Sequence, residues 1–95
     1  MNLDFLNFKT PHEVAMELAE KEKAKRKYKK LTQKQLADRS GVSLGSLKRF
    51  ERTGEISLAS LLKLAFVLDS LKEFEGLFPK PEYKSIQEII DANNK

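Results

Sequence analysis

The chain has 95 residues and a net charge of +4, which suits one small domain with a modest hydrophobic core. It has no cysteine, so a disulfide framework and thiol chemistry are excluded. Its longest apolar stretch, LASLLKLAFVLDSL, is too short to span a bilayer, and the N-terminus lacks the pattern of a secretory signal. We therefore expect a cytoplasmic protein.

The positive charge is concentrated in the middle of the chain. Residues 21–52 hold twelve Lys or Arg against three acids, a net charge of +9. Residues 1–20 hold one Lys against four acids, and residues 53–95 hold five Lys against seven acids. This pattern favours a polyanion-binding face in the middle segment, and the alternative is an ordinary solvated helix face.

A first helix is expected to begin at the motif TPHE. Thr10 can cap this helix, Pro11 suits its first position, and Glu13 would complete a capping box. Its apolar stripe begins with Val14 and Leu18. The basic run at its end, KEKAKRKYKK, is partly explained without a ligand, because cations stabilise a helix C-terminus.

Two short helices separated by a tight turn are expected next. Thr32 with Gln35 predicts a capped helix ending near residue 39, and Ser43 predicts the start of another over about residues 44–52. Gly41 suits the left-handed conformation that such a turn requires. Apolar, small and turn-forming residues occupy the positions that a DNA-binding helix-turn-helix needs: Leu36, Ala37, Gly41, Val42, Leu47 and Phe50. The alternative is a purely structural helical hairpin.

The rest of the chain is also expected to be helical. Ser57 predicts the start of a helix over about residues 58–69, which should be the most buried element because it is apolar on most sides. Its core candidates are Leu58, Leu61, Leu62, Ala65 and Leu68. A short helix over 70–77 and a last one, begun by a capping box of Ser85 and Glu88, complete an all-α prediction.

The segment LTQKQLADRSGVSLGSLKRFE resembles the Xre/Cro group of lambda-repressor-like helix-turn-helix domains. The likeness rests on Thr-Gln at the helix start, Leu-Ala within it, Gly-Val-Ser at the turn and a Glu near the end of the second helix. It covers about residues 10–78 and is most specific over 31–52. It implies a five-helix domain at 10–78, flanked by an N-terminal extension (1–9) and a C-terminal tail (79–95) with a short helix. It also implies operator binding, usually as a dimer, and usually repression.

The segment SLKRFERTGEISLASLLKLAFVLDSLKEFEGLF, followed by a proline-containing tail, is similar to HipB-type antitoxins. Those regulators are encoded beside HipA-type kinase toxins. The resemblance implies an antitoxin that represses its own promoter and binds a HipA-type toxin. The alternatives are a stand-alone Xre-family transcription regulator without a toxin partner and an adaptor that has lost DNA binding.

The helix over 44–52 would lie in the major groove, where its N-terminal residues meet base edges. The expected base-reading residues are Leu44, Gly45, Lys48 and Arg49. Arg49 suits a bidentate contact with guanine, although a phosphate contact or a solvated side chain is the alternative. Lys48 can touch a base or a phosphate. Leu44 can pack on a thymine methyl group, on the preceding helix or on a partner protein.

Phosphate contacts are expected around this helix. Gln33 and Lys34 open the preceding helix, whose free N–H groups suit a phosphate, and the matching glutamine of the resembled family anchors the DNA backbone. The full set of expected phosphate-binding residues is Lys29, Lys30, Gln33, Lys34, Ser46 and Arg52.

Two further surfaces are expected to bind protein. A homodimer on a two-fold operator could use the last helix of the domain, although these side chains could instead only close the core. The expected dimer residues are Leu71, Phe74, Leu77 and Phe78. The extensions carry apolar residues that could dock on the domain, pair across a dimer as a strand or bind another protein, and we expect one extension to contact a toxin-like partner. These apolar residues are Leu3, Phe5, Leu6, Phe8, Ile86, Ile89 and Ile90.

The sequence shows no pattern typical of an enzyme. His12 is the single histidine, it has no cysteine with which to share a metal, and the four glycines are scattered. We expect no catalytic residues, metal or cofactor.

Overall fold

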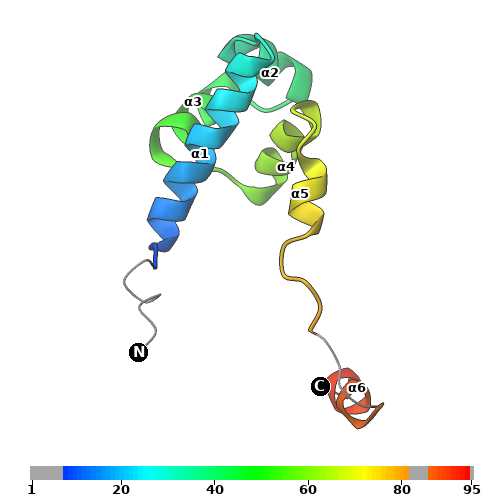
Figure 1. Cartoon of the computed structure of the whole chain (residues 1–95). Helices are drawn as coiled ribbons and strands as arrows, with labels where there is room; N and C mark the ends of the chain where they lie inside the picture. Colours follow the sequence, from blue (N-terminus) through cyan, green and yellow to red (C-terminus); the bar gives the residue numbers. More distant parts are fainter. Residues whose placement is uncertain (1–7, 82–85, 95) are drawn as a thin grey trace.

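The computed structural model describes residues 8–81 and 86–94. Predictions for Leu3, Phe5, Leu6 and the Ser85 cap lie outside the described residues. The helices are α1 (Pro11–Tyr28), α2 (Gln33–Ser40), α3 (Leu44–Thr53), α4 (Leu58–Val67), α5 (Leu71–Glu75) and α6 (Ile86–Asn93) (Figure 1). The described part of the chain contains helices and no strand, which confirms the all-α prediction.

The helix starts follow the polar residues that precede them. The Thr10 hydroxyl accepts a hydrogen bond from the Glu13 N–H at 3.1 Å. Thr32 and Gln35 form a full capping box at the start of α2. Ser43 and Ser57 cap α3 and α4 in the same way. These bonds satisfy N–H groups that the first turn of a helix leaves unpaired, so the sequence alone positions these four starts.

Two glycines end helices in the left-handed conformation. Gly41, at φ 79°, closes α2 and confirms the predicted turn. Gly54, at φ 78°, closes α3, and a Cβ there would lie 3.0 Å from the Ala15 carbonyl carbon. Glycine is therefore required at Gly54 both by the backbone angle and by the close approach of α3 to α1.

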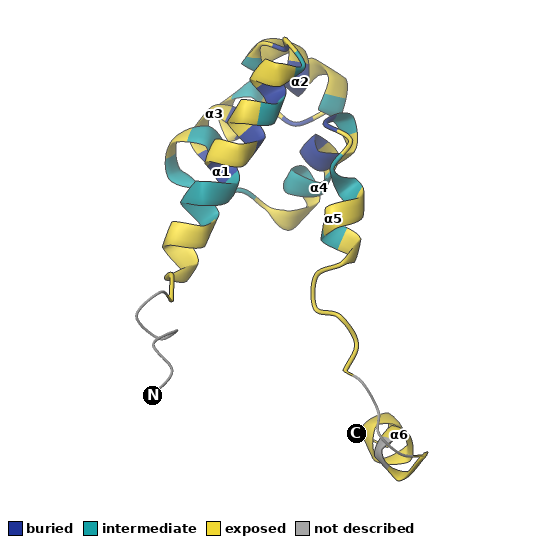
Figure 2. Ribbon diagram, viewed as in Figure 1, coloured by how far each residue is buried: buried dark blue, intermediate teal, exposed yellow. Residues whose placement is uncertain are grey.

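The core lies where α1, α2, α3 and α4 meet. Figure 2 shows the buried residues on the helix faces that turn toward one another, whereas α6 is exposed and lies apart from the other helices. The largest fully buried side chains are Phe50, Leu36, Leu47 and Leu64. The small side chain of Ala37, also buried, allows α2 to cross α3 closely.

The prediction for α4 was wrong in two respects. Leu58, a predicted core residue, is 65% exposed, and Phe66 is 69% exposed, so part of the apolar surface of α4 is left uncovered. Leu64, which the sequence analysis did not select, is completely buried. α4 packs mainly on α2 and α5, so one face is covered even though the helix is apolar on most sides. Ala65 and Leu68 are buried as predicted.

The helix ends in this region also differ from the prediction. α4 ends at Val67 and α5 spans Leu71–Glu75, which is shorter than the expected 70–77. Asp69 adopts a positive φ of 57°, and Phe78 one of 52°. Each of these left-handed residues turns the chain, so neither helix can continue through it.

Candidate nucleic-acid interface

The α3 helix is anchored by one face and presents the other to solvent. Leu47 and Phe50 are buried in the core. Gly45, Lys48 and Arg49 are exposed on the opposite face. Three of the four predicted base-reading positions are therefore accessible to a ligand.

Leu44 is placed differently from its neighbours on α3. It is half-buried and packs against the core cluster. Of the three alternatives left open for Leu44, packing within the domain is thus already present in the free protein.

Arg49 is held by an acid that the sequence analysis did not select. Its Nε and Nη2 atoms donate to Glu55 Oε2 at 3.2 and 2.6 Å. Both side chains are more than 60% exposed, with values of 62% and 63%, so solvent screens the pair. A guanine or a phosphate that binds Arg49 must replace or share the Glu55 carboxylate.

A buried ion pair fixes the start of α2 relative to α1 and α3. Arg26 donates from Nε and Nη2 to the two carboxylate oxygens of Glu51 at 2.8 and 2.9 Å, and from Nη1 to the Leu31 carbonyl at 2.9 Å. The Gln33 side chain donates to Glu51 Oε1 at 3.1 Å. The predicted phosphate-binding Gln33 is therefore oriented by Glu51, and its side-chain amide is already engaged.

From the sequence alone, Arg26 is one more member of the basic run at the end of α1. Its role depends on Glu51, which is 25 residues away. It also depends on burial, because less than a tenth of either side chain remains exposed. The only sequence feature that pointed to this ion pair was Glu51 itself, the Glu near the end of α3 that belongs to the helix-turn-helix motif. No local pattern indicated its partner.

A second acid, Glu22, lies beside this pair with an unusual protonation. Its two carboxylate oxygens are buried and have no hydrogen-bond donor in the structure, and Arg26 Nε lies 4.0 Å away. Burial raises the pKa of Glu22 to about 8, and the adjacent Glu51 adds to that rise. Burial alone would also raise the pKa of Glu51, but the hydrogen bond from Arg26 is the chief cause that lowers it overall. At neutral pH Glu22 thus carries a proton, which it can donate to the Glu51 carboxylate.

The predicted phosphate-binding cations are not equivalent. Lys30, Lys34 and Arg52 are exposed. Lys29 is half-buried and pairs with Asp69, and this ion pair lowers the pKa of the aspartate. Lys29 is therefore partly neutralised before any ligand binds.

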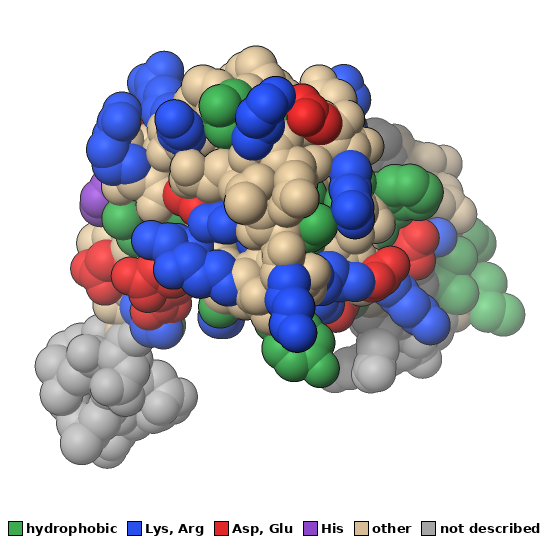
Figure 3. All heavy atoms as spheres, turned by 90° about the horizontal axis from the view of Figure 1, so that it is seen from above, with side chains coloured by type: hydrophobic (Ala, Val, Ile, Leu, Met, Phe, Trp, Pro, Cys, Tyr) green, Lys and Arg blue, Asp and Glu red, His purple; other side chains and the backbone are tan. Residues whose placement is uncertain are grey.

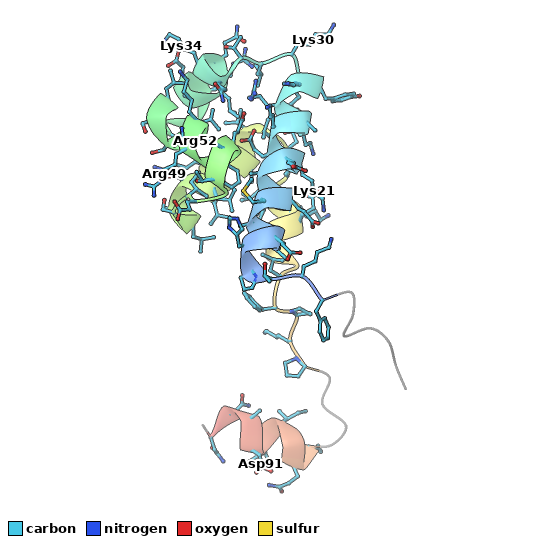
Figure 4. All side chains as sticks on the ribbon, turned by 90° about the vertical axis from the view of Figure 1, so that its left-hand side faces the viewer. Lys21, Lys30, Lys34, Arg49, Arg52 and Asp91 are labelled. Carbon is cyan, nitrogen blue, oxygen red and sulfur yellow. The ribbon has the colours of Figure 1, made fainter. Side chains whose placement is uncertain are left out.

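The basic side chains reach different sides of the domain. Figure 3 shows Lys and Arg side chains over the end of the molecule where α2 lies, with a few acids among them. Figure 4 shows Lys34 and Arg49 on the side of α2 and α3, whereas Lys21 lies on the opposite side of α1. The predicted phosphate-binding Ser46 is exposed on the α3 side, where its hydroxyl lies 2.8 Å from that of Ser43.

The predicted protein-binding residues vary in exposure. Leu71 and Phe74 are half-buried, as closing the core would require. Leu77 is 57% exposed and Phe78 is 96% exposed. The described residues of the two extensions are likewise exposed: Phe8, Ile86, Ile89 and Ile90. The exposure of the four predicted dimer residues is therefore compatible with both alternatives, closing the core and docking a partner.

The helix-turn-helix family model HTH_3 matches residues 23–74, which is more than half of the chain. The chain therefore belongs to this family of Xre-like, lambda-repressor-like helix-turn-helix proteins. It is a DNA-binding transcription regulator. No curated protein and no solved structure gives a match. Within the described residues, no helix is long and apolar enough to cross a membrane.

Proposed function

We propose that the protein is a sequence-specific repressor that binds a two-fold operator as a homodimer. The observation that carries this proposal is the exposed face of α3, where Lys48 and Arg49 project from a helix anchored by buried Leu47 and Phe50. A rigid helix that offers a guanidinium to solvent suits bidentate recognition of guanine in the major groove.

The other residues of the site have supporting roles in this proposal. Gly45 lets the helix approach the bases closely. The N–H groups at the start of α2, with exposed Lys30, Lys34, Ser46 and Arg52, hold phosphates on both sides of the groove. Lys29 contributes to the same surface once DNA competes with its aspartate partner.

The operator test is a fluorescence-anisotropy titration against the protein's own upstream DNA and a shuffled duplex near physiological salt. A specific repressor should bind its own DNA at least about a thousandfold more tightly. Equal, weak and salt-sensitive binding to both duplexes would mean charge attraction without sequence reading.

The roles of individual residues are tested by two substitutions. Arg49→Ala should flatten the preference for operator over random DNA, because a bidentate base contact contributes about 1–3 kcal/mol of discrimination. Lys30→Ala should weaken binding to both duplexes similarly and reduce the salt slope by about one unit. An equal loss of specificity in the two variants would contradict this assignment.

We further propose that the protein is a HipB-like antitoxin that represses its own operon and neutralises a HipA-type kinase toxin. The exposed apolar side chains of the extensions, such as Phe8 and Ile86, favour a protein partner over a stand-alone regulator. If the proposal holds, deleting residues 1–8 or 82–95 should weaken co-purification with a kinase encoded next to the gene while leaving the helical melt unchanged. Retention of the kinase by both truncated chains would contradict the role of the extensions, and failure of the full chain to co-purify with the kinase would favour the stand-alone regulator.

A further inference from the structure

An apolar groove runs between α1 and the α4–α5 pair. It consists of two adjoining cavities of about 300 and 330 Å³. The two cavities share four lining residues: Leu18, Lys21, Glu73 and Phe74. Leu61 and Leu64 of α4 line the inner cavity, and Val14 and Leu77 line the outer one.

The groove exists because α1 and α5 diverge. The helix pairs with extensive contacts are α1 with α3, α2 with α3 and α4, and α4 with α5, and Figure 1 shows α1 and α5 splayed apart below α2. As a result Val14 is 52% exposed and Leu77 is 57% exposed at the mouth. Covering such apolar surface stabilises a fold by about 25 cal/mol for each Å² removed from water.

The same chain carries a helix that lacks a surface to pack on. Ile86, Ile89 and Ile90 follow the i, i+3, i+4 spacing that places them on one face of α6, and all three are exposed. The opposite face is polar, with a hydrogen bond of 3.0 Å from the Gln87 amide to Asp91. A helix of 8 residues is too short to be stable alone in water, so α6 needs an apolar surface to pack its isoleucines against.

The path of the chain carries α6 outward from its own domain. After α5 the backbone continues through Pro79 and Pro81 without helical structure, and α6 lies apart from the other five helices (Figure 1). The radius of gyration is 17.7 Å. A compact chain of this length would have a value of about 12 Å. This shape is that of a domain with a projecting arm, and an arm of this kind can reach a neighbouring molecule.

We propose that α6 of one chain fills the α1–α4–α5 groove of a second copy, and that two chains exchange these arms about a two-fold axis. Each groove then gains the isoleucine stripe that the partner chain leaves exposed. Phe74 and Leu77 become part of the dimer surface in this arrangement. The isoleucines of α6 are then occupied within the dimer, so the toxin contact proposed above belongs to the N-terminal extension, and deletion of residues 82–95 would weaken it only through loss of the dimer.

The cross-link that tests this proposal uses the natural absence of cysteine from the chain. A tagged Lys21→Cys chain is mixed with an untagged Ile90→Cys chain and oxidised mildly. Lys21 is an exposed residue that lines both cavities, so its substitution spares the core. We expect a disulfide between the two chains of different size, because a docked α6 brings position 90 within cross-linking reach of the groove wall.

The matched control is Asp91→Cys, on the polar face of α6, which should give several-fold less of the mixed dimer. Equal cross-linking from Asp91→Cys, or none from Ile90→Cys, would overturn the proposal. So would a disulfide that forms only within single chains carrying both Lys21→Cys and Ile90→Cys, because α6 would then occupy its own groove.

Sedimentation of the unmodified chain gives an independent readout. A dimer at tens of micromolar that becomes monomeric in the Ile89→Asp variant is expected, and a monomeric unmodified chain would refute arm exchange. The proposal rests on the homodimer of the proposed function, and neither readout involves DNA or a toxin. Failure of the cross-link in a chain that sediments as a dimer overturns arm exchange alone, whereas a monomeric chain contradicts the homodimer as well.

Discussion

Replacing Glu22 with glutamine should stabilise the protein, and the gain should increase with pH. The substitution keeps the shape of the side chain but removes a carboxyl group whose buried oxygens have no donor in the structure. The new amide can donate to Glu51, as the protonated acid can. Glu22→Gln therefore mimics the acid form at every pH.

The size of the effect follows from the raised pKa of Glu22. The pKa is about 8 in the folded chain and 4.5 for the free side chain. The stability that depends on the bound proton is complete below the lower value and is lost as the pH rises through the upper one. At pH 7 the unfolded chain has released this proton and the folded chain has kept it, which destabilises the fold by about 3 kcal/mol at most.

Urea unfolding followed by far-UV circular dichroism at several pH values measures this difference. Wild type and Glu22→Gln should have similar unfolding free energies near pH 5. The wild-type value should then decline toward pH 8 while that of the variant stays nearly constant. Glu20→Gln, at an exposed position on the same helix, is the matched control and should follow the wild type. Parallel curves for wild type and Glu22→Gln would refute the reasoning, because the acid would then be ionised in the folded state.

Three further predictions test other features of the structure. Arg26→Ala should cost about 3–5 kcal/mol in chemical unfolding, because it leaves buried acids without their cation, and a loss below about 1 kcal/mol would show that the ion pair is solvated. Leu64→Ala should cost about 2–5 kcal/mol, whereas Leu58→Ala should change stability by less than about 0.5 kcal/mol; similar losses would contradict the orientation of α4. Glu55→Gln should raise affinity for random duplex DNA by up to about fivefold, since it frees Arg49, the proposed base-reading arginine, from an exposed ion pair, and Glu75→Gln on α5 should leave this affinity unchanged.

Features that depend on neighbours within one or two helical turns could be predicted from the sequence. The caps at Thr32, Ser43 and Ser57 were predictable because a hydroxyl just before a helical apolar pattern can bond the N–H three residues later. Gly41 was predictable because only a few residue types tolerate its backbone angle. The spacing of apolar residues around this turn also predicted which face of α3 is buried and which positions remain accessible, although Leu44 is half-buried.

Contacts between groups far apart in the sequence are visible only in the folded chain. Arg26 and Glu51 are 25 residues apart, Lys29 and Asp69 are 40 apart, and no local pattern pairs them. The orientation of α4 was undecided for a related reason, because a helix apolar on most sides is positioned by the helices it packs against. Burial of Glu22, and hence its protonation, likewise depends on how tightly other helices exclude water from α1. Electrostatic and packing energies depend on the distance between groups in space. The sequence gives that distance only for residues within one or two turns of the same helix.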